Sequence, residues 1–300
     1  MMQQVKGYLR LMRPANIVTA ISDILAGIAI AVYFIGIQPG DIQLLPAFLL
    51  VLATIGLYGG GVVFNDVFDA ALDKVERPER PIPSGLIQKR KAAILGAALL
   101  TGGIVAATFV HQQFFPSGFI ALVIAIAALV YDKWTKHYKF TGPVNMGACR
   151  GLNLLLGMSL YPEAVYHYWG ICLVPVLYIA AITMISRGEV HGGKKQTLYT
   201  AAFLYAVVIG SIFFISFFNQ TVLFSLVFLV LFAAMIFIPL RQAIRSPKGP
   251  LIGKAVKAGV LALILMNAAW AAAFGILYLA LIILLLMPLS LWMAKAFAVT

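Results

Sequence analysis

The chain has 300 residues, of which 62% are hydrophobic and 11% are charged, and its formal net charge is +12 at pH 7. Soluble globular domains are nearer half apolar, so this composition excludes an ordinary soluble protein and predicts a polytopic membrane protein. The positive charge then indicates contact with an anionic membrane leaflet and anionic substrates, and it does not indicate nucleic acid.

Apolar windows of about 20 residues predict an all-α fold of membrane-spanning helices. In chain order the windows lie near 15–36, 44–64, 92–113, 117–133, 142–160, 167–186, 198–217, 220–240, 252–272 and 275–295. Only Phe274-Gly275 separates the last two windows and no charge marks the break, so the expected number of spans is nine to ten. Because no linker or soluble segment interrupts the pattern, residues 1–300 are expected to form a single domain.

The basic residues predict which end of the bundle faces the cytoplasm. All 22 Lys and Arg residues fall in the N-terminal segment, in alternate loops near 65–91, 132–141, 187–197 and 241–251, or in helix ends that open from that side. The opposite connections carry only Asp41 and Glu163 as charged residues. Under the positive-inside rule the protein is an integral, multi-pass membrane protein whose polar loops are cytoplasmic. Topology alone accounts for most of this bias.

The first predicted span carries a polar stripe. Asn16, Thr19 and Asp23 recur at i, i+3 and i+7, so they share one face of the helix. Such a stripe in a membrane helix more often lines a cavity than faces lipid. Asp23 is the deepest carboxylate of the chain, and it is either protonated and silent or paired with Arg150 of the fifth span.

The second span ends in an acidic motif. Asn65, Asp69 and Asp73 are spaced i, i+4 and i+8, so a helix would stack their oxygens along one face. Oxygen ligands suit a hard cation such as Mg²⁺. A solvated helix end is the alternative, but four carboxylates between positions 66 and 76 would repel one another unless a cation neutralised them. Asp66, about 100° round the helix from Asn65, is instead a candidate partner for a basic residue.

Basic residues follow this motif at once. Lys74, Arg77 and Arg80 lie in the loop after it, and cations beside a metal site favour a phosphate ligand. After Tyr131, Lys133, Lys136 and Lys139 recur at i, i+3 and i+6 in a second basic loop. These three lysines form either a topology-setting belt or a set of cations that holds diphosphate oxygens, with Lys136 preferred.

The fifth span contains Arg150 and, three residues later, Asn153. Arg150 either snorkels to the nearby interface or faces a cavity, and the second polar group on the same face favours the cavity. The third polar loop contains Glu189 and His191 among glycines, which let the backbone approach an anion closely.

The acidic motif, together with the Arg80-Pro81-Ile82-Pro83-Ser84-Gly85 segment after it, resembles the first aspartate-rich motif of the UbiA superfamily of intramembrane prenyltransferases. The segment Leu11–Asn16 is similar to the first-helix signature of that family. Tyr131-Asp132 and Arg150–Asn153 fall where the family has similar segments. The resemblance covers roughly residues 10–275.

The resemblance implies a ring of helices around a lipid-open central cavity with a polar cytoplasmic cap. It implies Mg²⁺-dependent transfer of a prenyl group from an isoprenyl diphosphate to a lipophilic acceptor, aromatic or lipid, among membrane lipids. Metal ligands would be Asn65, Asp69, Asp73 and Glu189, and Asp69, Asp73 and Lys136 would be catalytic. The substrate-binding candidates are Asn16, Asp23, Arg80, Tyr131, Lys133, Arg150, Asn153, Glu189 and His191.

The third loop departs from the family pattern. Where the family usually has two aspartates spaced D-x-x-x-D, this chain reads Glu189-Val190-His191-Gly192-Gly193, with a single acid. This form is similar to an EboC-like branch of the superfamily, and it places a two-metal clamp in doubt. The alternative function is therefore a catalytically reduced member that transports or carries a lipophilic metabolite. Prenyl chain length, acceptor and oligomeric state stay open.

Overall fold

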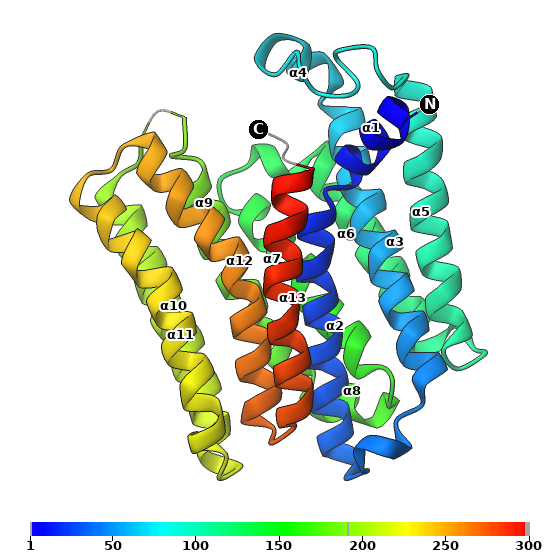
Figure 1. Ribbon diagram of the computed structural model, residues 1–300, viewed down its shortest axis with the longest axis vertical. Helices are drawn as coiled ribbons and strands as arrows, with labels where there is room; N and C mark the ends of the chain where they lie inside the picture. Colours follow the sequence, from blue (N-terminus) through cyan, green and yellow to red (C-terminus); the bar gives the residue numbers. More distant parts are fainter. Residues whose placement is uncertain (1, 191, 298–300) are drawn as a thin grey trace.

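A computed structural model of the protein describes residues 2–190 and 192–297, which are helical with no strand among them (Figure 1). The long helices run up and down the bundle: α2 (Pro14–Ile35), α3 (Leu44–Phe68), α5 (Lys89–Phe109), α6 (Phe119–Lys133), α7 (Thr141–Met158), α9 (Leu173–Ser186), α10 (Lys195–Phe218), α11 (Val222–Arg245), α12 (Gly249–Ala273) and α13 (Leu277–Ala296). The short helix α1 (Met2–Met12) precedes them. Other short helices lie in the connections: η1 (Pro39–Asp41), α4 (Ala70–Glu76), η2 (Phe114–Gly118), η3 (Thr135–His137), α8 (Pro162–Tyr168) and η4 (Trp169–Cys172).

Within the described ranges, nine helices are long and apolar enough to cross a membrane. The helix α7 is outside that set because Asn145, Arg150 and Asn153 lower its hydropathy, yet it packs beside α2, α6 and α9. The helix α1 and the C-terminal end of α13 lie at the same end of the molecule, as an even number of passes requires. Each of the ten predicted windows therefore corresponds to a long helix.

The two windows with the weakest boundary are separate helices. The helix α12 ends at Ala273 and α13 begins at Leu277. Between them Gly275 has a φ of 74°, in the left-handed region that side chains disfavour. The glycine reverses the chain here without any polar or charged residue in the turn.

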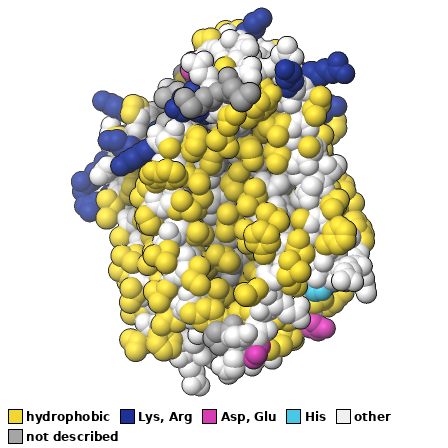
Figure 2. Space-filling view, turned by 45° about the vertical axis from the view of Figure 1, so that its right-hand side comes forward, with side chains coloured by type: hydrophobic (Ala, Val, Ile, Leu, Met, Phe, Trp, Pro, Cys, Tyr) yellow, Lys and Arg dark blue, Asp and Glu magenta, His cyan; other side chains and the backbone are white. Residues whose placement is uncertain are grey.

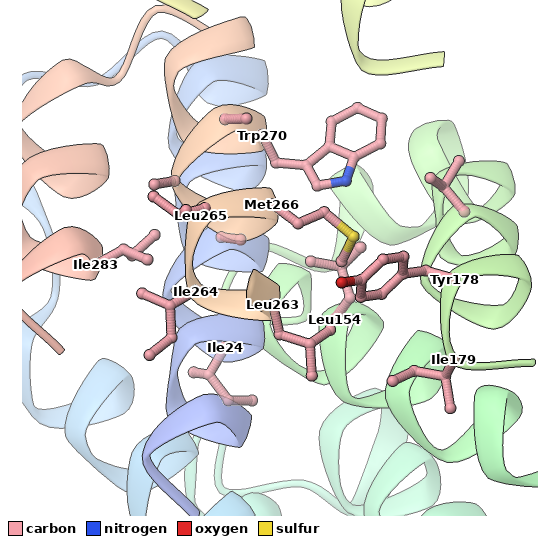
Figure 3. Close-up of a cluster of buried hydrophobic side chains, with 14 of the residues drawn as sticks. Ile24, Leu154, Tyr178, Ile179, Leu263, Ile264, Leu265, Met266, Trp270 and Ile283 are labelled. Carbon is pink, nitrogen blue, oxygen red and sulfur yellow. The ribbon is translucent and has the colours of Figure 1, made fainter. Parts of the chain in front are cut away.

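The core of the bundle is centred on α2 and α12, which bury 78% and 72% of their most apolar segments, whereas α13 buries 22%. From α12, Leu263, Met266 and Trp270 extend toward Tyr178 of α9 (Figure 3). Because lipid is as apolar as these side chains, close packing rather than exclusion from water holds such helices together.

Glycine allows the closest of these approaches. A Cβ atom added at Gly27 of α2 would overlap the backbone of Leu154 in α7, and one added at Gly157 of α7 would overlap the backbone of Ile24. The two helices therefore touch along their backbones, as small residues permit in membrane bundles. This contact places the polar side chains of α2 directly against those of α7.

Charged side chains gather at one end of the molecule. Lysine and arginine side chains lie at the end that carries α1 and α4, and acidic side chains without neighbouring Lys or Arg stand out at the other end (Figure 2). Between the two ends the surface in view is mostly apolar. A charged end, an apolar band and a nearly uncharged end match the requirements of a bilayer.

Candidate active site

A cavity of about 270 Å³ lies among α2, α3, α6, α7, α9 and α12. Its wall along α3 runs from Thr54 to Asn65, which is about 16 Å of helix. The apolar part of its lining is Leu57, Val62, Ile124, Ala128, Met146, Ile179, Ile182, Val260 and Leu263. The polar part is Arg13, Asn16, Thr54, Tyr58, Asn65, Tyr131, Asp132, Arg150, Asn153 and Thr183. Of the candidates from the sequence, Asn16, Asn65, Tyr131, Arg150 and Asn153 line it.

At the basic end of the cavity, two helices bring oxygen donors together. Asn65 of α3 donates a hydrogen bond from Nδ2 to Oδ1 of Asp132 in α6, at 2.9 Å. Asp132 is buried, with 5% of its surface exposed, and it lines the cavity. The motif of α3 therefore faces a carboxylate that sequence spacing did not place beside it.

The three oxygen-bearing residues of the acidic motif remain on successive turns. The Asp69 amide donates to the Asn65 carbonyl at 2.9 Å, and the Asp73 amide donates to the Asp69 carbonyl at 2.8 Å. The helix is interrupted at Asp69, where α3 ends and α4 begins. Their side chains nevertheless have three different partners: Asn65 binds Asp132, Asp69 binds Lys136 and Asp73 binds Arg80.

Arginines hold the carboxylates that point away from the cavity. Arg80 donates from Nη1 to Asp73 at 2.7 Å and to Asp66 at 3.3 Å, and all three side chains are buried. Arg13 lies between α1 and α2, where its backbone has a φ of 50°, and it donates to Asp66 at 2.7 Å. The predicted pairing of Asp66 with a basic residue is confirmed. These contacts fasten the loop after α4 to the start of α2.

The second basic loop provides one lysine to the acidic motif. Lys136 Nζ lies 2.5 Å from Oδ1 of Asp69, and both side chains are partly shielded from solvent. Lys133 is exposed and lies 4.5 Å from the centre of the Trp134 ring, a cation–π contact. Of the two lysines, Lys136 is therefore the one positioned beside the motif.

A buried polar network forms the inner wall of the cavity. Arg150 of α7 donates to Asp23 at 2.7 Å and to Thr19 at 2.6 Å, both on α2, so the predicted Asp23–Arg150 pair is confirmed. Asn153 donates to Asp23 at 3.1 Å, and its Oδ1 accepts a hydrogen bond from Thr54 at 2.8 Å. The guanidinium carbon of Arg150 lies 5.1 Å from the centre of the Tyr58 ring.

Asn267 completes this network from α12. Its Nδ2 lies 2.7 Å from Oδ1 of Asp23 and 2.7 Å from the Ser22 hydroxyl, so it donates to the α2 stripe. Asn267 is not among the residues predicted from the sequence, although a single amide inside a long apolar helix was a usable signal. Asp132 is likewise absent from the predicted ligands, although it is a carboxylate at the end of an apolar span.

Glu189 lies apart from the cavity lining, in the turn between α9 and α10, and its side chain is exposed. Partial burial raises the pKa of its carboxyl above the usual value, while Lys257 and Arg77 oppose that rise. Arg77 belongs to the segment that follows α4, so this loop and the α9–α10 turn lie near one another. His191 lies outside the described residues.

The donor set fits a hard divalent cation. Asn65, Asp69 and Asp132 offer amide and carboxylate oxygens, the ligands that Mg²⁺ prefers. As placed, no three His, Cys, Asp or Glu side chains within residues 2–190 and 192–297 are grouped closely enough to hold a metal. Asp69 is paired with the Lys136 ammonium.

The chain is similar in sequence to several archaeal proteins named digeranylgeranylglyceryl phosphate synthase. Digeranylgeranylglyceryl phosphate synthase of Methanosarcina barkeri (strain Fusaro / DSM 804) is 29% identical over 167 residues, which are 54% of this chain and 57% of the relative. The same enzyme of Sulfurisphaera tokodaii is 31% identical over 181 residues, 60% of this chain and 61% of the relative. The chain thus spans about three fifths of the length of the curated relatives it matches.

Solved structures share the fold at low sequence identity. A structure concerned with digeranylgeranylglyceryl phosphate synthase in membranes has a TM-score of 0.66 at 23% identity, over 90% of this chain and 98% of that one. The apo UbiA homolog from Aeropyrum pernix K1 has a TM-score of 0.67 at 16% identity, over 84% and 96%. The UbiA homolog from Archaeoglobus fulgidus bound to GPP and Mg²⁺ has a TM-score of 0.58 at 15% identity, over 91% and 99%.

These likenesses establish the fold, and the family follows from the sequence. Residues 24–249 match the model of the UbiA prenyltransferase family. This match includes the acidic motif, the second basic loop, Arg150 and Asn153, whereas Asp23 and Asn267 lie outside it. Since the match covers most of the chain, the protein belongs to the UbiA prenyltransferase family.

Proposed function

We propose that this protein transfers a prenyl group from an isoprenyl diphosphate to a lipophilic acceptor within the membrane, with Mg²⁺ as cofactor. One observation carries the proposal: a single cavity joins a mouth of amide and carboxylate oxygens to an apolar interior. The mouth suits a metal-bound diphosphate and the interior suits an isoprenoid chain. The names of the synthases that resemble this chain support a lipid acceptor.

Asn65 and Asp69 would hold the metal, and Mg²⁺ supplies Lewis-acid stabilisation of the diphosphate leaving group when bound. Asp73, predicted from the sequence as a third ligand, is bound by Arg80 and does not line the cavity. Lys136 would leave Asp69 and donate to the diphosphate oxygens, since a charge-assisted hydrogen bond to phosphate replaces the one it loses. Arg80 and Arg13 keep the loop and the start of α2 in place through Asp66 and Asp73.

The cavity wall has its own part in the reaction. When the allylic C–O bond breaks, the developing carbocation must meet the acceptor before it meets water. Leu57, Ile124 and Leu263 line the interior and exclude water from it. The Tyr58 ring, already against the Arg150 guanidinium, presents a π face that stabilises positive charge. Arg150 and Asn153, held by Asp23, would orient the polar part of the acceptor.

The proposal includes the orientation of the protein in the membrane and the extent of its domain. The basic end of the molecule would face the cytoplasm, because membrane proteins retain Lys and Arg on that side. Isoprenyl diphosphates are water-soluble at their charged end, so a mouth on that side would receive them. Residues 1–300 would act as a single domain.

The test is turnover by the purified protein in lipid nanodiscs with Mg²⁺, a lipid acceptor extract and donors of increasing length, beginning with DMAPP and GPP. Wild type is expected to release pyrophosphate and form a prenylated lipid, and Asp69→Ala is expected to do neither while keeping its elution volume and melting temperature. Asp41→Asn, at the opposite end of the bundle, is the matched control. Donor binding without pyrophosphate release would replace this proposal with the carrier function.

A further inference from the structure

We propose that Asp132 is a ligand of the divalent cation that accompanies the diphosphate, so that the metal site joins α3 to α6. The inference rests on the function proposed above and adds a residue to its site. The observations that carry it are the burial of Asp132, its lack of an ion-pair partner among residues 2–190 and 192–297, and its distance from Asn65.

Asp132 differs from the other buried aspartates in its charge partners. The others each bind arginine: Asp23 binds Arg150, Asp66 binds Arg13 and Arg80, and Asp73 binds Arg80. In the part of the chain that the structure describes, no Lys or Arg nitrogen lies within ion-pair distance of Asp132. Its hydrogen-bond donor there is the neutral amide of Asn65.

A buried carboxylate that has only a neutral amide as its hydrogen-bond donor is costly, because the amide restores only part of the stabilisation that water gave. Such a group within a membrane helix is functional by default. Asp132 also lines the cavity, so a ligand that enters can reach it. A divalent cation would compensate the charge of the Asp132 carboxylate.

The distance between the two side chains fits an octahedral cation. Asn65 Nδ2 and Asp132 Oδ1 are 2.9 Å apart. Ligand atoms about 2.0–2.1 Å from Mg²⁺ and at right angles to one another are about 2.9 Å apart. Rotating the Asn65 amide by 180° would exchange its nitrogen for its oxygen, so two oxygens would then stand at the spacing of adjacent ligands.

The backbone connects this pair to the rest of the motif. Asp69 lies one turn beyond Asn65, with its amide bonded to the Asn65 carbonyl. A cation between Asn65 and Asp132 is therefore within one helical turn of Asp69, whose carboxylate Lys136 now holds. The site would take oxygens from α3 and α6 and complete its shell with diphosphate and water.

The experiment measures metal binding directly. Mn²⁺ is titrated into the protein in nanodiscs with saturating inorganic pyrophosphate, and free Mn²⁺ is followed by its electron paramagnetic resonance signal, with the buffer–pyrophosphate background subtracted. Asp132→Asn removes the charge at constant size and keeps a partner for Asn65. Asp132→Glu restores a carboxylate. Asp41→Asn is the control for loss of a negative charge elsewhere.

Asp132→Asn is expected to raise the Mn²⁺ dissociation constant at least about tenfold, since even loss of an outer-shell partner commonly costs about 10–100-fold. Asp132→Glu should recover part of that loss, and Asp41→Asn should match wild type. If Asp132→Asn binds Mn²⁺ as wild type does, the inference is overturned. Loss of turnover with unchanged Mn²⁺ binding also overturns it, because Asp132 would then act on the acceptor. If wild type itself binds no Mn²⁺ with pyrophosphate, the proposed function fails first.

Discussion

Arg150 of α7 donates a hydrogen bond from Nη1 to Oδ2 of Asp23 in α2 at 2.7 Å, and both side chains are buried inside the bundle. Asn267 of α12 binds the other oxygen of Asp23. One carboxylate therefore ties together the three helices that enclose the inner end of the cavity. The same arrangement leaves Arg150 lining the cavity, so a structural ion pair also supplies its inner polar surface.

The first prediction concerns this ion pair. Asp23→Leu should destabilise the protein by about 3–5 kcal/mol, because it leaves the Arg150 cation buried without compensation. The double variant Asp23→Leu/Arg150→Met should recover most of that stability, since no isolated charge remains. Reversible unfolding in mixed micelles would measure both. A double variant as unstable as the single one would show that the unpaired Arg150 cation is not the cause of the lost stability.

The second prediction concerns Lys136. Lys136→Gln should raise the KM for the diphosphate donor roughly tenfold or more, since hydrogen bonds to charged groups contribute about 1.5–3 kcal/mol. The melting temperature should change little, because the Asp69–Lys136 pair is partly exposed. Lys133→Gln is the matched control, as that lysine lies over Trp134 rather than beside an acid. Equal effects of the two substitutions would point to general surface charge instead.

The third prediction concerns the loop after α4. Asp66→Asn should loosen residues 78–88, because Asp66 is the carboxylate that Arg13 and Arg80 share. Hydrogen exchange in that segment should become faster, and proteolysis there should begin at lower protease concentration. Glu79→Gln, at an exposed position in the same loop, should leave both measurements unchanged. Unaltered exchange in Asp66→Asn would mean that the turn holds itself together.

The fourth prediction tests the contact between α2 and α7. Gly27→Ala should destabilise the protein by about 1–3 kcal/mol, because the new methyl group overlaps the backbone around Leu154. Gly210→Ala in α10 meets no atom within 4 Å and should be neutral or stabilise by up to about 1 kcal/mol. Thermal unfolding of the two variants side by side gives the comparison, and equal stability would argue against close helix contact at Gly27.

The fifth prediction concerns donor length. Ala128 of α6 lines the cavity, so Ala128→Phe should reduce the space for a long isoprenoid chain. We expect kcat/KM to fall more for long donors than for DMAPP, by roughly tenfold or more where a full side chain is displaced. Ile126→Phe on the same helix is the control, since Ile126 is 52% exposed on the outer surface. A uniform loss across donors would place Ala128 outside the chain-binding path.

Much of the fold could be predicted from local features. Each membrane span is a property of about 20 consecutive residues, so the windows can be located without knowledge of their neighbours. The boundary between α12 and α13 was weak because the turn at Gly275 contains no polar residue, and the chain reverses there through backbone conformation alone. The helix α7 is the opposite case: its polar residues lower its hydropathy, although it lies inside the bundle.

The candidate site could also be predicted only in part. The spacing of Asn65, Asp69 and Asp73 indicated neighbouring turns, and the backbone bonds agree. That spacing could not reveal three different side-chain partners, because Asp132 and Lys136 lie 67 residues away and reach the motif only after α6 packs beside α3. Asn267 lies 244 residues from Asp23 and reaches it through α12.

By itself the sequence determined the membrane class, the spans, the charge asymmetry and the residue types available for chemistry, because hydropathy and helical period act over short stretches of chain. Only the tertiary structure decided which buried carboxylates pair with arginine and that Asp132 lines the cavity with no Lys or Arg paired to it in the described part of the chain. Charge compensation depends on distances of a few ångströms between separate helices, and those distances exist only once glycine-mediated contacts have brought the helices together.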